Sequence, residues 1–286
     1  MSSTIAVLAI NGLVFGLIIA LIALGLSIIF GLLDVINLSH GDFFMIGTVI
    51  AYTVITSTGL FWPAFILAPL IGLILGALIH LMVIKPLKNA AALTIVATFG
   101  LSMIIQEVVR MTFGAAPKRL MPPIEGTFNL FGVDYEIYRI FAAVASVVAI
   151  GAFFVFLKKT KLGTWMRAVR HDRDTATALG IPTQKVFMIT FGLGFAMAAM
   201  GGVVAAPITT VDFRTGVDIL PFCFMAVIIG GLGNLPGTAA AAVLLAFMEG
   251  VISGFADPTI ARICSLVLMS MVLLFRPQGL FKGLTK

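Results

Sequence analysis

Few side chains in this sequence are of the types that carry out catalysis, and they do not combine into a recognisable set. The three histidines stand at positions 40, 80 and 171, and none has a plausible nucleophile–base arrangement around it. A zinc site needs three or four protein ligands, and nothing near His40 completes such a group. We therefore predict no catalytic residue and no metal ligand, and we expect the chain not to be an enzyme.

Nucleotide-binding motifs give no better match. The stretch GLGNLPG has the wrong glycine spacing for a dinucleotide-binding loop, and it follows an apolar helical run rather than a strand. The sequence contains neither GxxxxGKS nor GxxxxGKT, so the chain does not hold ATP by a P-loop of its own. We expect no cofactor to be bound by this chain.

Two acidic residues lie inside long apolar runs, where a charge is costly. A carboxylate at the centre of a membrane span costs roughly 2.5–3.5 kcal/mol on insertion scales, so Glu107 and Glu249 should face the protein interior or lie near an interface. Arg110 is placed to form an i,i+3 ion pair with Glu107, whereas Glu249 has no such partner and should lie near the outer surface. The alternative is a proton relay through either residue, which would make the protein a secondary carrier.

The composition indicates an integral membrane protein. Of 286 residues, 60% are hydrophobic and 10% are charged, whereas soluble domains are about 25% charged. Basic residues occur in short loops, and no basic face alternates with exposed aromatics, so the net charge of +6 does not indicate a nucleic-acid partner. We predict an all-α transmembrane bundle in the lipid bilayer, with residues 1–286 forming a single domain.

Apolar runs long enough to cross a bilayer set the number of helices, since a span needs about 20 such residues. We predict eight to ten membrane segments, some of them broken or re-entrant, from nine apolar runs: 5–33, two within 43–84 that separate near 59–63, 91–113, 140–157, 184–206, two within 219–253, and 259–275.

Lysines and arginines in short loops predict the orientation, because such loops stay on the cytoplasmic side. The cytoplasmic markers are Lys85, Lys88, the stretch 158–183 together with Lys185, Arg276, Lys282 and Lys286. Counting spans between these markers gives the same side each time. The N-terminus and the loops 114–139 and 207–218 are then outside.

The stretch 158–183 is the longest polar island in the chain. Its basic residues outnumber Asp172 and Asp174, and it contains helix signals, with Thr164 as a candidate N-cap and Gly180 with Pro182 as a stop. We predict one short amphipathic helix that docks a cytoplasmic partner. The alternative is a solvated loop whose charge only sets the topology.

Two apolar helices are interrupted by polar, glycine-marked breaks, at 31–42 and at 230–237. Broken helices are tolerated at membrane depth only where they are buried in protein or line a cavity, and pairs of them often mark a transport path. The predicted path residues are Asn37, Ser39, His40, Gly41, Asn234, Pro236 and Gly237. The alternative for the first break is a cytoplasmic turn whose polar side chains cap a helix over 43–58.

Four stretches resemble the conserved blocks of a known family, the branched-chain amino acid permeases of bacterial ABC importers. They are GLSIIFGLLDVINLSHGDFFMIGTVIAY, RDTATALGI, GGLGNLPGTAAAAVLLAFMEGV and the C-terminal LLFRPQGLF. They follow the family's order and cover essentially the whole chain. The patterns VIN-x-x-HG-x-F and FRPQGLF are the most specific of these, although Ser39 stands where the family often has alanine.

The resemblance implies one permease subunit of an importer in the bacterial cytoplasmic (inner) membrane. The implied partners are a second and often different permease subunit, two cytoplasmic ATPase subunits that bind ATP and Mg²⁺, and a periplasmic solute-binding protein that delivers solute to the outer loops. Leucine, isoleucine or valine is the expected solute, with urea, short amides or other amino acids as alternatives. A channel or a membrane enzyme is a third class of protein. The sequence contains neither the charged filter ring of a channel nor the catalytic cluster of an enzyme, and this counts against both.

The resemblance also assigns residues that couple to the ATPase. The family's loop carries an E-A-A-like run before Gly-Ile, and here the matching positions are Asp174, Thr175, Ala176, Gly180 and Ile181. Thr175 departs from the family pattern. We expect Asp174, Ala176, Gly180 and Ile181 to couple to the ATPase, together with Arg167 and Arg170 of the same predicted helix.

Overall fold

The computed structural model describes residues 2–87, 90–130 and 133–281, so Lys88, Lys282 and Lys286 lie outside the described residues. Its helices, in chain order, are α1 (Ser2–Leu33), α2 (His40–Thr58), α3 (Ala64–Ile79), which continues as the π-helical turn η1 (His80–Ile84), α4 (Ala91–Phe113), α5 (Ile137–Lys159), α6 (Lys161–His171), α7 (Arg173–Ala178), α8 (Thr183–Ala205), α9 (Thr215–Gly230), α10 (Leu235–Ile252) and α11 (Pro258–Phe275).

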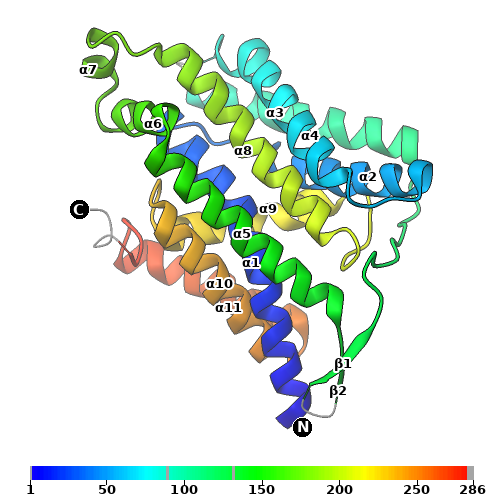
Figure 1. Ribbon diagram of the computed structural model, residues 1–286. Coiled ribbons are helices and arrows are strands. Elements are labelled where there is room, and N and C mark those ends of the chain that lie inside the picture. Colours follow the sequence, from blue (N-terminus) through cyan, green and yellow to red (C-terminus); the bar gives the residue numbers. More distant parts are fainter. Residues whose placement is uncertain (1, 88–89, 131–132, 282–286) are drawn as a thin grey trace.

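The predicted all-α bundle is confirmed, and each of the nine apolar runs forms a helix. Eight helices of the described chain are long and apolar enough to cross a membrane. The exception is α9, whose 16 residues span about 24 Å, less than the roughly 30 Å of a bilayer core. Figure 1 shows α9 in the middle of the bundle, where its neighbours α1, α2, α10 and α11 enclose it.

Helices α1 and α8 form the centre of the bundle and are its most deeply buried spans (Figure 1). They cross where Gly25 meets Gly194, so closely that a Cβ on either glycine would overlap the other backbone. Lipid gives helices no hydrophobic drive to associate, and small residues that allow this close approach supply the packing instead. The peripheral helices α4 and α11 expose most of their apolar side chains.

The chain between α1 and α2 turns back into the bundle. Asp34 has a left-handed backbone conformation, with φ of 53°, at the point where α1 ends. His40, the first residue of α2, lies with Nε2 3.0 Å from the carbonyl oxygen of Ile22, roughly three helical turns before the end of α1. Helix α2 therefore begins inside the bundle, and the first break is a re-entrant segment.

The two loops predicted to lie outside are found together at one end of the bundle. Lys118 and Val211 exchange both backbone hydrogen bonds, at 2.9 and 2.8 Å. The first loop also forms a hairpin of β1 (Thr127–Leu130) and β2 (Val133–Glu136), in which Phe128 pairs with Tyr135. This hairpin was not predicted. We call this end of the molecule, which carries β1 and β2, the outer end.

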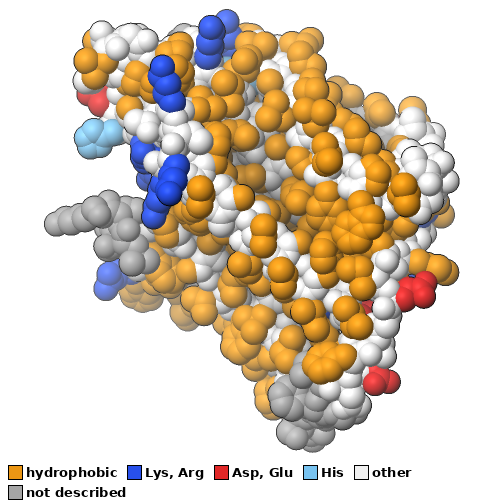
Figure 2. All heavy atoms as spheres, viewed as in Figure 1, with side chains coloured by type: hydrophobic (Ala, Val, Ile, Leu, Met, Phe, Trp, Pro, Cys, Tyr) orange, Lys and Arg blue, Asp and Glu red, His pale blue; other side chains and the backbone are white. Residues whose placement is uncertain are grey.

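The opposite end carries α6 and α7, and we call it the basic end. Figure 2 shows lysine and arginine side chains gathered there, with hydrophobic surface over the faces between the two ends. The single helix predicted from Thr164 to Gly180 is wrong, because two helices form. Thr160 caps α6 by accepting a bond from the N–H of Gly163, and Asp172 ends α6 and caps α7. The predicted stop is found at Gly180, whose φ is 80°.

Candidate translocation, docking and outer sites

The polar residues of the first break are fully buried, which a solvated turn would not require. Asn37, Ser39, His40 and Asp42 each expose 1% or less. The Asn37 side-chain oxygen accepts bonds from the N–H and the hydroxyl of Ser39, at 3.1 and 2.8 Å. Ser39 precedes α2 but makes no side-chain capping bond to it. Ser39 therefore does not act as the helix cap that the alternative interpretation requires.

Three polar atoms of this segment have no partner among the described residues. They are Asn37 Nδ2, His40 Nδ1 and Asp42 Oδ2. A buried polar group without a hydrogen bond costs about 1–3 kcal/mol, so such a cluster is destabilising unless something else uses it. The segment thus has donors and acceptors available in the middle of the bundle.

A stripe of polar residues on α4, which we call the α4 stripe, faces the first break. It consists of Thr94, Thr98, Ser102 and Gln106 at a spacing of four residues, so these lie on one face of the helix. Thr98 accepts a bond from the N–H of Leu38 at 3.2 Å. Gln106 donates to Asp42 Oδ1 at 3.2 Å and to the Ser102 hydroxyl at 2.8 Å.

Sequence reasoning missed both the α4 stripe and Asp42. A polar residue recurs at every fourth position of this mostly apolar span, and that recurrence was the signal for the stripe. Asp42 was not predicted as a path residue, although it is an acid buried inside the bundle, a position that usually marks a functional site.

The second break forms a tight turn at the basic end. Asn234 caps α10 by accepting a bond from the Gly237 N–H at 3.1 Å, and its amide donates to the carbonyl of Phe281 at 2.8 Å. The C-terminal segment crosses this turn so closely that Gly279 lies against Gly231. Asn234 and Gly237 are thus used in the turn itself, whereas Pro236 is exposed beside it.

The docking segment and both breaks meet at the basic end, which the sequence did not predict. A Cβ on Gly233 would lie 3.2 Å from Arg170 Nη2 and 3.2 Å from the Cα of Gly31. Arg167 donates to the carbonyl of Leu157, so it also points back toward the bundle. A cavity of 180 Å³ lies between α6, the end of α1 and the second break. Partial burial there lowers the pKa of Arg170.

The other residues assigned to ATPase coupling differ in exposure. Asp174 and Gly180 are exposed and Ile181 is half-buried. Ala176 is buried in the same apolar cluster as Val186 of α8, so it holds α7 against the bundle. Leu179, next to Gly180, was not predicted to matter, but it is a large apolar side chain with 77% exposure.

Asp172 should control how firmly α7 is held. Its carboxylate accepts bonds from the Thr175 hydroxyl and N–H and from the Asp174 N–H, and these bonds lower the pKa of Asp172. Asp172→Ala should speed hydrogen–deuterium exchange of the Asp174 and Thr175 amides several-fold, as measured by mass spectrometry, while Asp172→Asn should retain most protection. In the parent protein the protection should be complete above the unfolded pKa of Asp172 and weaken only in part as pH drops through the lowered value, because the protonated carboxyl keeps an acceptor oxygen, as asparagine does. Unchanged exchange in Asp172→Ala would contradict this role.

The two membrane acids lie in different places. The predicted ion pair is confirmed, with Arg110 Nη2 2.5 Å from Glu107 Oε1, but both side chains are over 40% exposed on the outward face of α4. Glu107 therefore does not face the interior. Glu249 lies in the last turn of α10 toward the outer end, as predicted, with Arg262 and Ser265 of α11 as neighbours.

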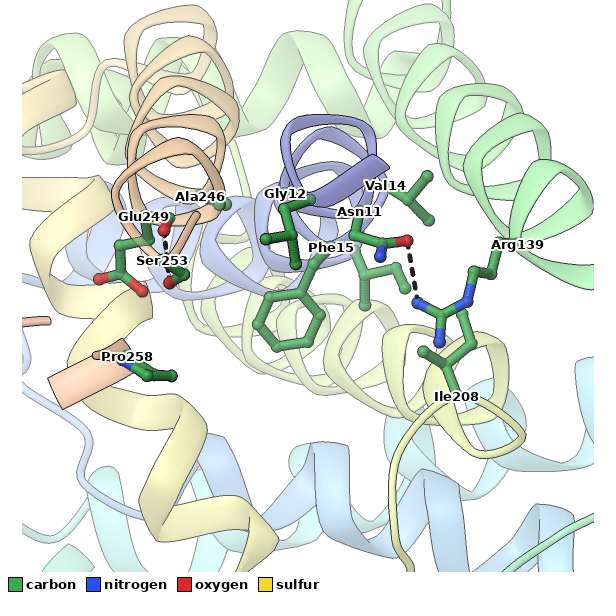
Figure 3. Close-up of a pocket in the computed structure, with 13 residues that line it drawn as sticks. Asn11, Gly12, Val14, Phe15, Arg139, Ile208, Ala246, Glu249, Ser253 and Pro258 are labelled. Atoms are coloured by element: carbon green, nitrogen blue, oxygen red, sulfur yellow. Dashed lines mark hydrogen bonds between the residues drawn. The ribbon is translucent and has the colours of Figure 1, made fainter. Parts of the chain in front are cut away.

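A cavity of 360 Å³ opens among the outer ends of α1, α5, α10 and α11, and we call it the outer pocket. Figure 3 shows Asn11 and Arg139 at one side, Glu249 and Ser253 at the other, and Phe15 between them. Arg139 donates to Asn11 Oδ1 at 3.2 Å and to Glu136 Oε2 at 3.0 Å. The remaining lining is mostly apolar, and it includes Val14, Ile18 and Ile208.

A bundle of broken helices with a basic docking segment is the architecture expected of a transport subunit, and the family comparison agrees. The family profile described as branched-chain amino acid transport system / permease component matches residues 8–276, from the first turns of α1 to the end of α11. The chain belongs to this family. It is therefore a multi-pass membrane permease subunit, which confirms the resemblance seen in the sequence.

Individual relatives match the permease over nearly its whole length. The high-affinity branched-chain amino acid transport system permease protein LivH of Salmonella typhimurium is 28% identical, covering 94% of this chain and 93% of LivH. BraD of Pseudomonas aeruginosa, with the same description, is 27% identical over 95% of this chain and 94% of its own. LivM of the same Salmonella strain is 25% identical, over 91% of this chain and 67% of LivM. No solved structure is a significant match.

Proposed function

We propose that the permease is one membrane subunit of an ATP-driven importer of branched-chain amino acids in the bacterial inner membrane. The observation that carries this proposal is the family match over residues 8–276, together with relatives named for high-affinity branched-chain amino acid transport. LivH and LivM are both similar to this chain and come from one organism, which supports a second, homologous permease as partner. ATP and Mg²⁺ would be bound by two ATPase subunits, and a periplasmic protein would deliver the amino acid.

The ATPase should contact the exposed face of α7 and the turn that follows it. Asp174 offers a charge and Leu179 an apolar anchor of the kind that fills a partner's pocket. Arg167 and Arg170 then act as links inside the subunit, since they connect α6 to α5 and to the second break. A displacement of the docking segment would thereby move Gly233 and the end of α1 together.

The translocation path should run along the first break and the α4 stripe. These two features place polar groups deep in the bundle, three of them without partners in the described chain. Few contacts hold α4 to its neighbours, so it can move away from the break without disrupting the core. An amino acid that passes there would replace the missing hydrogen bonds. Asn234 and Gly237 belong instead to the turn at the basic end.

ATP dependence is the test of the proposed function. Proteoliposomes that contain the permease, its partner permease and the ATPase pair should take up labelled L-leucine when the loaded binding protein is outside and ATP with Mg²⁺ is on the ATPase side. Omitting ATP should abolish uptake, and a protonophore should leave it unchanged. Uptake that survives without ATP and stops with the protonophore would identify a proton-coupled carrier. Competition by isoleucine, valine, urea and short amides would define the solute.

A further inference from the structure

We propose that the outer pocket is a binding site for an aliphatic α-amino acid, with Arg139 as the ligand of its carboxylate. This inference rests on the proposed function, because it concerns the same substrate at its entry point. It assigns a role to residues that neither the motifs nor the breaks of the chain single out.

The guanidinium of Arg139 is fixed in place before any ligand arrives. Its Nε donates to Glu136 Oε2 at 3.0 Å, and Nη1 donates to Asn11 Oδ1 at 3.2 Å. These bonds use two of the five N–H groups of a guanidinium, and the planar fork is suited to bidentate binding of a carboxylate. Glu136, the N-cap residue of α5, adds a negative charge beside the positive one. An α-amino acid carries the same two opposite charges, on an ammonium and a carboxylate group that are bonded to one carbon.

The walls next to Arg139 suit a branched aliphatic side chain. Figure 3 shows Val14 and Ile208 on the same side of the pocket as the guanidinium, with Phe15 in the middle of the pocket. The volume of 360 Å³ lies within the range of about 300–1,000 Å³ found for small-molecule sites, which are mostly apolar with a few placed polar groups. Glu249 lies beyond Phe15, and its carboxylate is turned away from Arg139. The carboxylate-binding end is therefore separate from Glu249.

The position of the pocket connects it to the proposed path. Phe15 packs edge-on against Phe222 of α9, with ring centroids 6.4 Å apart. The first turn of α9 in turn packs on the start of α2, where Gly216 lies against Gly41 and Asp42. The outer pocket and the buried polar break thus lie on two sides of the short helix α9.

A labelling experiment on the assembled transporter tests this site without requiring transport. Ile208→Cys, in a background with the exposed Cys264 changed to serine, places a thiol in the pocket for a membrane-impermeant maleimide. Millimolar L-leucine should slow labelling several-fold, whereas leucinol, which lacks the carboxylate, should give little protection. Arg139→Gln should weaken protection by leucine about tenfold or more.

The matched control is Arg110→Gln. It breaks another i,i+3 arginine–glutamate pair in the outer half of the molecule, and neither residue of that pair lines a described pocket. It should leave protection unchanged. Absence of protection, equal protection by leucine and leucinol, or undiminished protection in Arg139→Gln would each overturn the proposal. The comparison of leucine with leucinol is made without the Arg139→Gln substitution, so it does not depend on whether that variant folds. ATP-dependent uptake by the parent protein without leucine protection would reject this site and leave the proposed function standing.

Discussion

Uptake should be lost when Gly180 is replaced by proline, although the chain should still insert and fold. Gly180 has a φ of 80°, and a proline ring holds φ at about −65°, so the turn between α7 and α8 cannot form. The Gly180 N–H that donates to the Thr177 carbonyl at 3.0 Å is also removed. Nothing lies within 4 Å of an added Cβ, so crowding does not contribute. The damage is therefore limited to the orientation of α7.

Two measurements would check this result: labelled L-leucine uptake, and the amount of ATPase that copurifies with the tagged permease. Both should fall to background in Gly180→Pro. Gly180→Ala should be milder, because a left-handed alanine costs only about 1–2 kcal/mol.

Gly59→Pro is the matched control for this substitution. Gly59 ends α2 at the outer end with a φ of 71°, its N–H donates to Ile55 at 2.9 Å, and it too has no atom within 4 Å of an added Cβ. The local strain is comparable, but the site is far from the docking segment, so most uptake and all ATPase association should remain. Equal loss in both variants would argue against a docking role for the turn at Gly180.

The sequence predicts the membrane helices well because each span needs a long apolar run that charges or glycines end. The run 91–113 coincides with α4, and 184–206 differs from α8 by one residue at each end. The docking segment was harder, since Thr160 and Thr164 are both acceptable N-caps and local propensity does not choose between them. Asp172 could have been recognised as a second cap, because Thr175 three residues later supplies a hydroxyl and an N–H.

Depth in the bundle could not be predicted from local sequence. The residues around Asp42 are equally compatible with a solvated turn, and the re-entrant path depends on the left-handed Asp34 and on the close approach of Gly41 to Gly216 of α9. The approach of Gly31 to Gly233, with Arg170 beside them, joins three segments far apart along the chain. Neither an apolar pattern nor a short motif encodes such a meeting point.

The second large effect is expected at the buried acid of the first break. Asp42→Asn keeps the size of the side chain and the oxygen that accepts from Gln106, and it replaces only Oδ2, which has no partner in the described chain. If that oxygen receives the ammonium group of a passing amino acid, leucine uptake should fall about ten- to a hundredfold, because a hydrogen bond to a charge is lost. Thermal stability should stay the same or rise, since a buried amide is less costly than an unpaired carboxylate.

The stability measurement separates transport from folding, and a second acid separates two mechanisms. A structural Asp42 would lose stability and uptake together, whereas a path residue loses uptake alone. Glu107→Gln removes an acid from the exposed face of α4, where its ion pair with Arg110 contributes little to folding, so uptake should be retained. Normal uptake by Asp42→Asn would exclude the first break as the path. If Glu107→Gln lost uptake instead, the acid required for transport would be one that faces away from the first break. That result would favour proton coupling.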